Sequence, residues 1–111
     1  MLLRDECFAE SCFHAEQTGQ LALKAFLYNQ GERFVPIHSV KQLTEQCASY
    51  DGGLAQLIDA GKILDQYYIP TRYPDAMAFP GVPYETYTER QAKEAVQLAS
   101  NIVDFVKMKV S

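Results

Sequence analysis

The chain of 111 residues contains 48% hydrophobic and 22% charged residues, with six Gly and five Pro, which excludes disordered, collagen-like and low-complexity classes and fits one domain, residues 1–111. The formal net charge of −4 provides no global positive field for a nucleic-acid backbone, so any such contact needs a local patch. Because no apolar run approaches the roughly 18 residues of a membrane-spanning helix, we expect no membrane contact and a cytoplasmic protein.

Residues 5–29 are predicted to form the first helix, because apolar residues recur there at alternating spacings of four and three. This seam consists of Phe8, Cys12, Ala15, Gly19, Ala22 and Phe26. A glycine weakens a helix by up to about 1 kcal/mol, so Gly19 indicates that a neighbouring helix approaches closely at this strip. Gly31 follows as the predicted C-cap.

The three cysteines, Cys7, Cys12 and Cys47, show no CxxC spacing, and we expect reduced thiols. Cys7 and His14 share one face of the predicted helix, whereas Cys12 points about 140° away. We therefore expect neither a metal site nor a cofactor.

A second, short helix is predicted from Ser39, which has the capping-box spacing to Gln42, until the sequence DGG at positions 51–53 ends it near Tyr50. The next helix is expected over residues 54–67. Its apolar side consists of Leu54, Leu57, Ile58, Gly61, Leu64 and Tyr68.

Four prolines, at positions 70, 74, 80 and 83, predict one long irregular loop that reaches about Tyr87. Thr88 and Gln91 repeat the capping-box spacing at the start of a last helix, which runs to about Lys109. Its predicted inward residues are Ala92, Ala95, Val96, Ala99, Ile102, Val103, Val106 and Val110. Since no segment alternates with period two, we predict an all-α fold: an antiparallel bundle of three long helices and one short helix, with a Pro/Tyr-rich loop before the last.

The long loop also concentrates groups that bind ligands, because five of the seven tyrosines lie between positions 67 and 87, around Arg72. An arginine there can hold a phosphate or carboxylate bidentately, while the rings of Tyr68 and Tyr73 stack on a base and Asp65 orients Arg72. Alternatively, Arg72 pairs with Asp65 or Asp75 and pins the loop to the last helix.

Several segments carry a resemblance to a known family. LDQYYIPTRYPDA, at positions 64–76, closely resembles a segment of bacterial and archaeal HEPN proteins, and CFHAEQTGQLALKAFL and HSVKQL are similar to segments that precede it in that family. The ending VPYETYTERQAKEAVQLASNIVDFV is also similar, so the resemblance covers nearly the whole chain.

This resemblance implies a HEPN-like fold of the nucleotidyltransferase substrate-binding-subunit type and a bundle that dimerises. It further implies nucleotide or RNA binding and a small nucleotidyltransferase partner, in many cases within a toxin–antitoxin pair. Many members carry a further helix before the first one matched here. Either a second subunit then closes the seam around Phe8, Ala15 and Gly19, or the chain has a shortened start; we predict a homodimer.

Ribonucleases of the family carry an arginine followed after four to six residues by a histidine, but no histidine follows Arg72. Arg33 and His38 have this spacing, yet they lie in the early loop, where His38 matches the histidine of the HSVKQL segment. We therefore favour a non-catalytic module whose ligand-binding residues are Arg72, Tyr68, Tyr73, Asp65 and His38. The rivals are a metal-independent ribonuclease toxin that uses Arg72 and His38, and a purely structural helical oligomer.

Overall fold

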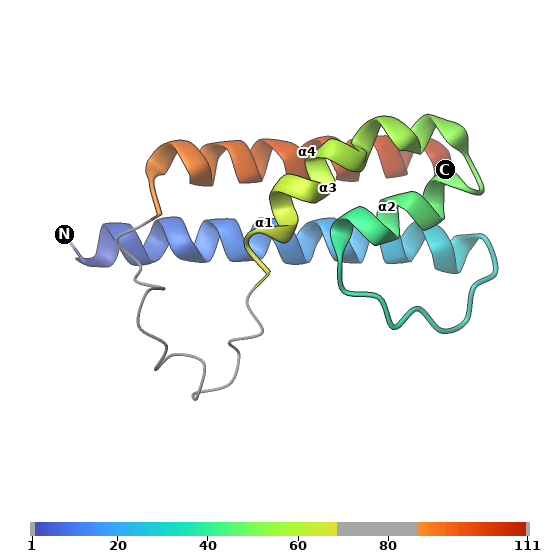
Figure 1. Cartoon of the computed structure of the whole chain (residues 1–111), viewed down its shortest axis with the longest axis horizontal. Helices are drawn as coiled ribbons and strands as arrows, with labels where there is room; N and C mark the ends of the chain where they lie inside the picture. Colours follow the sequence, from blue (N-terminus) through green and yellow to red (C-terminus); the bar gives the residue numbers. More distant parts are fainter. Residues whose placement is uncertain (1, 69–86, 111) are drawn as a thin grey trace.

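The computed structural model describes residues 2–68 and 87–110, and every regular element in these two ranges is helical (Figure 1). The elements are α1 (Leu2–Asn29), α2 (Val40–Ala48), the 3₁₀ helix η1 (Gly52–Leu57), α3 (Ile58–Asp65) and α4 (Glu89–Val110). The predicted all-α class is confirmed. The helix expected over residues 54–67 begins two residues earlier, as η1, and continues as α3.

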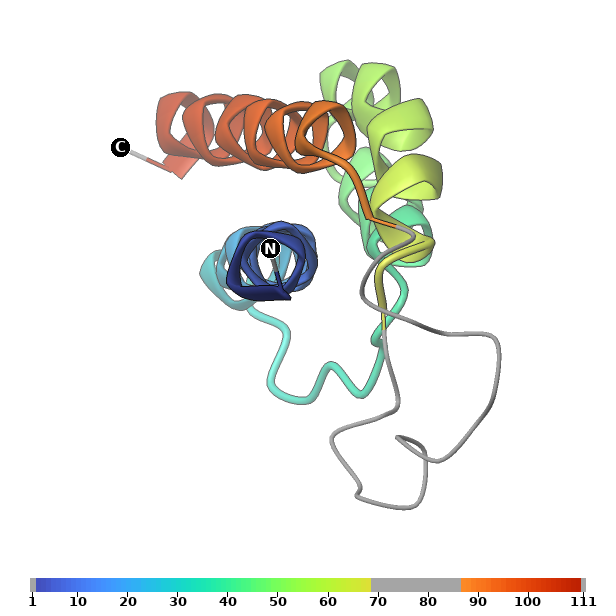
Figure 2. The ribbon, with the colours of Figure 1, turned by 90° about the vertical axis from the view of Figure 1, so that its left-hand side faces the viewer.

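The two longest helices, α1 and α4, lie side by side, and α2 and η1–α3 cover one side of this pair (Figures 1 and 2). The loop after α1 runs back along that helix, and α2 then runs in the same direction as α1. η1–α3 runs opposite to α1 and α4, as an antiparallel bundle requires, whereas α1 and α4 themselves are parallel.

The core lies where these helices meet, and at Gly19 the other helices approach α1 closely. A Cβ atom on Gly19 would lie 3.3 Å from Leu64 Cδ1, 3.5 Å from Val40 Cγ1 and 3.6 Å from Ile102 Cδ1. The predicted close approach at the Gly19 strip is therefore confirmed. At this position, α2, α3 and α4 of the same chain supply the cover that we had expected from a second subunit.

Two residues predicted on apolar helix faces are exposed, Tyr68 to 38% and Val96 to 52%, so these two predictions are wrong. The inward residues of α4 are spaced three and four apart, at Ala92, Ala95, Ala99, Ile102 and Val106. Val96 follows Ala95 directly and is therefore rotated by about 100° away from this line. A run of two apolar residues did not reveal which of them faces inward.

The predicted caps at Thr88 and Gly31 agree with the structure, whereas α1 begins three residues before the predicted start and α3 ends at Asp65 rather than at residue 67. Thr88 and Gln91 cap α4 reciprocally: Gln91 N donates to Thr88 Oγ1 over 3.1 Å, and Thr88 N donates to Gln91 Oε1 over 2.9 Å. Gly31 has φ 107°, a left-handed conformation that suits glycine after a helix.

Candidate ligand-binding site

The start of α2 is held by a carboxylate from the end of α3. Asp65 Oδ1 accepts a hydrogen bond from Val40 N over 2.6 Å, and Asp65 Oδ2 accepts bonds from Ser39 Oγ over 2.6 Å and Lys41 N over 3.3 Å. The first N–H groups of a helix have no partner within it and carry partial positive charge, so a carboxylate is favourable there. Asp65 thus joins two elements that the sequence separates by 25 residues.

Gly61 explains why Asp65 can reach α2. A Cβ atom on Gly61 would lie 2.8 Å from both the Cα and the N of Lys41, and 3.1 Å from Val40 C. These atoms are backbone and cannot move aside as a flexible side chain could. The absence of a side chain at Gly61 therefore sets the approach of α3 to α2, and Asp65 follows one helical turn later. We call Ser39, Val40, Gly61 and Asp65 the capping corner.

Two exposed aromatic rings meet beside the capping corner. The ring centroids of His38 and Tyr68 lie 6.1 Å apart, with planes only 10° from parallel. His38 directly precedes Ser39, and Tyr68 lies three residues after Asp65, so the Asp65 hydrogen bonds bring these two segments together. Both side chains are exposed, Tyr68 to 38%.

Three of the five predicted ligand-binding residues, Asp65, His38 and Tyr68, therefore lie close together. We call the pair His38 and Tyr68 the aromatic site. Arg72 and Tyr73 lie outside the described residues. The described partners of Asp65 belong to α2 and its N-cap, and three donors already use most of the roughly four acceptor positions of a carboxylate. Orientation of Arg72 by Asp65 stays a prediction.

Next to this site, Tyr67 packs into the core. It is 4% exposed, and its ring centroid lies 6.1 Å from that of Tyr87. Burial raises the pKa of Tyr67 to about 12. Residues 67 and 87, which precede and follow the long loop in sequence, therefore contact each other.

Comparison with known proteins identifies the family. The family model described as HEPN domain matches residues 1–109. The chain belongs to the HEPN family. The crystal structure of ST0689, an archaeal HEPN homologue, is similar with a TM-score of 0.67 and 31% identity, over 99% of this chain and 88% of that one. The curated proteins gave no match.

A buried carboxylate of this HEPN domain was missed by the sequence analysis. Glu16 is fully buried and accepts hydrogen bonds from Gln17 Nε2 over 2.8 Å and Gln20 Nε2 over 2.5 Å. A signal was present, because Glu16 lies four residues after Cys12 and three before Gly19 on the predicted seam. The amide donors compensate part of the cost of burying a carboxylate.

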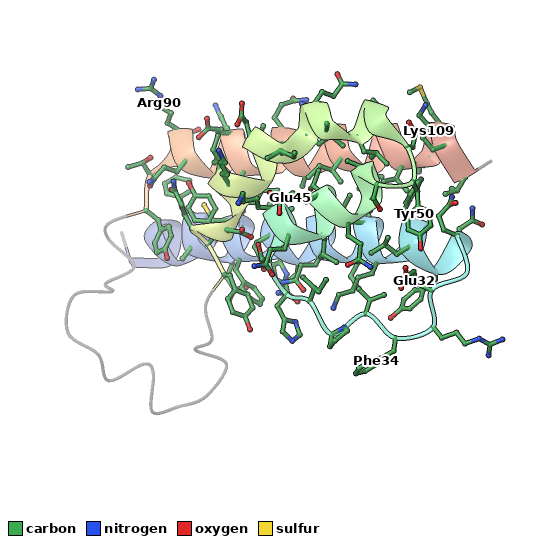
Figure 3. All side chains as sticks on the ribbon, turned by 45° about the vertical axis from the view of Figure 1, so that its right-hand side comes forward. Glu32, Phe34, Glu45, Tyr50, Arg90 and Lys109 are labelled. Carbon is green, nitrogen blue, oxygen red and sulfur yellow. The ribbon has the colours of Figure 1, made fainter. Side chains whose placement is uncertain are left out.

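Phe34 was also missed. It lies in the loop between α1 and α2, is 78% exposed, and projects away from the helices (Figure 3). Loop composition alone does not predict an exposed aromatic ring. The sequence feature that could have indicated this exposure is the position of Phe34 between Arg33 and Pro36, outside any apolar periodicity.

A second surface of the HEPN domain lies between α1 and α4, where two shallow hollows have volumes of about 360 and 330 Å³. Ser11 and Val96 line both of them. The other lining residues are His14, Ala15, Thr18, Ala99 and Ser100 in the larger hollow, and Cys7, Phe8, Glu89, Ala92 and Lys93 in the smaller one. Small and apolar side chains dominate this surface, which distinguishes it from the aromatic site.

The described residues contain no group of three or more His, Cys, Asp or Glu side chains that could hold a metal ion. Cys12 and Cys47 are buried, and burial raises their pKa values to about 11 and about 12, which keeps both thiols protonated at neutral pH. None of the helices in residues 2–68 and 87–110 is both long and apolar enough to cross a membrane.

Proposed function

We propose that this HEPN domain is a non-catalytic binding module for a nucleotide, and that the base of the nucleotide stacks at the Tyr68–His38 pair. The observation that carries this proposal is the exposure of two nearly parallel rings beside a rigidly capped helix start. Aromatic faces bind bases by stacking, which is worth about 1–3 kcal/mol per base. Anchoring by Asp65 reduces the ordering cost on binding.

Within this proposal, Arg72 holds the phosphate groups and Tyr73 adds a second aromatic contact. Arginine suits this role because its planar guanidinium donates two parallel hydrogen bonds to a phosphate. The two residues follow Tyr68 by four and five positions, so they lie within a few residues of the stacked pair in sequence.

Titration of ATP against the wild type and three variants tests this function. We expect Tyr68→Ala and Arg72→Ala each to weaken binding about tenfold, because they remove a stacking face and a phosphate partner. Tyr28→Ala is the matched control, since Tyr28 is 50% exposed on α1, outside the aromatic site. Equal affinities of Tyr68→Ala and Tyr28→Ala, or no binding of ATP by the wild type, would refute the proposal.

The same proteins distinguish binding from catalysis. A histidine that acts as general acid or base must come within hydrogen-bond reach of the reacting oxygen. We expect purified wild-type protein to leave a short single-stranded RNA intact. Cleavage that disappears in both Arg72→Ala and His38→Ala would instead establish a metal-independent ribonuclease and reject the non-catalytic function.

We further propose that the module is a homodimer that packs through the α1–α4 surface. An exposed apolar residue that lines both hollows supports this choice: Val96 is 52% exposed. Sedimentation at micromolar concentration should show a dimer for the wild type and a monomer for Val96→Asp. Met108→Asp, at a position that is 66% exposed near the end of α4, is the control and should remain dimeric. A well-folded wild-type monomer contradicts this part of the proposal.

A small nucleotidyltransferase is the protein partner that we propose, within a toxin–antitoxin pair in the cytoplasm. The support is the HEPN membership of the chain and the sequence resemblance described above. Co-expression with a small nucleotidyltransferase encoded beside this chain should give a complex that co-elutes in size-exclusion chromatography. Separate elution of the two folded proteins argues against the pairing.

A further inference from the structure

We propose that residues 33–38 are a docking site for another protein, an extended and acidic segment of which adds to them as a β-strand. We call residues 33–38 the docking segment. This inference goes beyond the proposed function and does not rest on it, because it uses the main chain of the segment rather than the rings of the aromatic site.

The docking segment is extended, although every regular element of the described residues is helical. Residues 32–39 contain no helix, turn or bend, and Ser39 at their end has φ −81° and ψ 125°, which is extended backbone. Pro36 is compatible with an extended chain and biases Val35, directly before it, toward the same conformation. The segment therefore already has the backbone of a β-strand, but it has no partner strand.

Burial alternates along the docking segment. Val35 is 5% exposed and Ile37 packs against the core, whereas Phe34, Pro36 and His38 are exposed. Alternation with period two is the property of an extended chain, in which every second side chain points to the same side. Val35 and Ile37 thus anchor the segment to the bundle. An added peptide meets a strand that is already ordered, which lowers the entropic cost of binding.

The main chain of the docking segment forms no hydrogen bond within residues 2–68 and 87–110. The nearest main-chain bonds flank it: Glu32 N donates to Leu27 O over 3.1 Å, and Leu43 N donates to Ser39 O over 2.9 Å. Main-chain N–H and C=O groups require a partner, and water supplies it where they are exposed. An extended peptide can replace this water by main-chain hydrogen bonds, as in strand addition to a sheet edge.

Exposure selects one edge of the docking segment. Successive residues of an extended chain direct their N–H and C=O groups to opposite edges. The groups of Phe34, Pro36 and His38 share an edge, and all three residues are exposed, whereas Val35 on the other edge is buried. Since proline has no N–H, this edge offers two donors, from Phe34 and His38, and three acceptors. A short peptide strand can use all of them.

Pro36 favours a foreign strand over a second copy of this chain. When two such edges pair symmetrically and antiparallel, Pro36 lies opposite Pro36, and neither residue can donate to the carbonyl of the other. A strand with an N–H group opposite Pro36 can bond to that carbonyl. The occupant is therefore a segment of another protein that has no proline at the central position.

The local charge selects an acidic partner. Arg33 is exposed and forms no ion pair within residues 2–68 and 87–110. Residues 33–41 contain no aspartate or glutamate, and Lys41 in this range pairs with Glu45 over 3.3 Å. Glu32, directly before Arg33, accepts a hydrogen bond from the Tyr50 hydroxyl. A carboxylate at one end of the added strand can therefore pair with Arg33, which favours a strand of complementary charge.

NMR titration of the labelled protein with a blocked peptide of sequence EVTVYVE tests the docking segment. Its valine, threonine and tyrosine residues favour strands, and a glutamate at each end brings a carboxylate near Arg33 in either strand direction. We expect binding at sub-millimolar concentration. The amides of Phe34 and His38 should exchange more slowly with water on binding, whereas those of Val35 and Ile37 should not change. Contact through side chains alone would not produce this alternation.

Two substitutions at exposed positions, neither of which should prevent folding, test the side-chain contribution. Phe34→Ala should weaken the binding of EVTVYVE about fivefold, because it removes a cross-strand contact. Tyr28→Ala is the matched control and should leave the affinity unchanged, since this aromatic residue is 50% exposed on α1, outside the docking segment.

Charge is tested by a second pair of variants. Arg33→Ala should weaken the binding of EVTVYVE about threefold, and it should not change the weaker binding of QVTVYVQ, in which glutamines replace the glutamates. Arg90→Ala, at an exposed position on α4 on the side of the molecule opposite to Phe34, is the control and should leave both affinities unchanged (Figure 3).

A peptide without donors gives the sharpest result. EVTVYVE with every amide N-methylated keeps its side chains but has no N–H group, and we expect it not to bind. Equal binding of the two forms, or no binding of EVTVYVE by the wild type at millimolar concentration, would overturn the proposal. Slower exchange of the Phe34 and His38 amides with rising protein concentration, without any peptide, would make a second copy the occupant and also overturn it.

Discussion

The capping corner and the loop that precedes it, residues 33–38, are adjacent in the chain, at Ser39 and His38, but they differ in what determines their side chains. In the corner, the backbone of Lys41 leaves no space for a side chain at Gly61. Three donors from α2 and its N-cap also converge on the Asp65 carboxylate. In the loop, Phe34 is 78% exposed and contributes little to the core. The fold therefore requires the residues of the corner, whereas it tolerates many side chains at the exposed positions of the loop. Substitutions in the two regions should separate stability from binding.

The largest expected effect comes from Gly61→Ala. Its new Cβ would lie 2.8 Å from two backbone atoms of Lys41, so α2 and α3 must move apart, at a cost of about 2–3 kcal/mol in the free energy of unfolding. Gly52→Ala is the control, because nothing lies within 4 Å of a Cβ at Gly52. Urea denaturation of both variants measures the difference; equal midpoints would show that the corner is not tightly packed.

A smaller effect is expected from Asp65→Asn. The amide keeps the size of the side chain but loses the negative charge that faces the α2 N-terminus, and it can accept through only one of its two terminal atoms. We expect a loss of about 1–2 kcal/mol in the free energy of unfolding. Asp104→Asn, at an exposed position on α4, should change it by less than about 0.5 kcal/mol. Thermal melts in which both variants match the wild type would contradict the anchoring role of Asp65.

Asp51 provides a second comparison, because its carboxylate also accepts a hydrogen bond at the start of a helix. It is the N-cap of η1, at the other end of the η1–α3 segment from Asp65. The Gly53 N–H bond and then the Lys109 ammonium, 3.1 Å away, lower the pKa of Asp51 below its ordinary value of 3.8. A lowered folded-state pKa stabilises the fold above that ordinary value, and this contribution is lost as the pH falls through the folded pKa.

Asp51→Asn should therefore lower the melting temperature slightly at pH 7, and the difference from the wild type should disappear as the pH falls through the lowered pKa of Asp51 in the folded protein. High salt should also reduce the difference at pH 7, because the ion pair is partly exposed. A difference that grows on acidification has the wrong sign for this mechanism. The effect should be smaller than that of Asp65→Asn, since water screens the exposed pair.

Sequence reasoning predicted the local structure well, because helix periodicity and caps depend on residues three or four positions apart. The reciprocal cap of Thr88 and Gln91 is an example. It could not predict the contact of Gly61 with Lys41, which depends on how α2 and α3 pack. For the same reason, residue chemistry alone could not predict that the rings of His38 and Tyr68 lie side by side. The family resemblance contributed to the prediction of each residue as a ligand-binding candidate.

The errors have the same physical origin. Val96 was placed inward because adjacent valine and alanine both fit an apolar pattern, and only packing distinguishes positions that differ by about 100° around a helix. Phe34 and Glu16 reverse the usual preference of apolar residues for the core and of carboxylates for water. Such reversals follow from the contacts of a particular fold, and composition does not reveal them.

Amide hydrogen exchange with and without saturating ATP tests most directly whether the ligand binds at the aromatic site. Our account predicts slower exchange on binding in residues 37–41 and 65–68, around the His38–Tyr68 pair and the capping corner, with residues 11–18 and 96–100 unchanged. Protection confined to those two stretches of α1 and α4 would place the ligand in the hollows between the long helices and contradict the account.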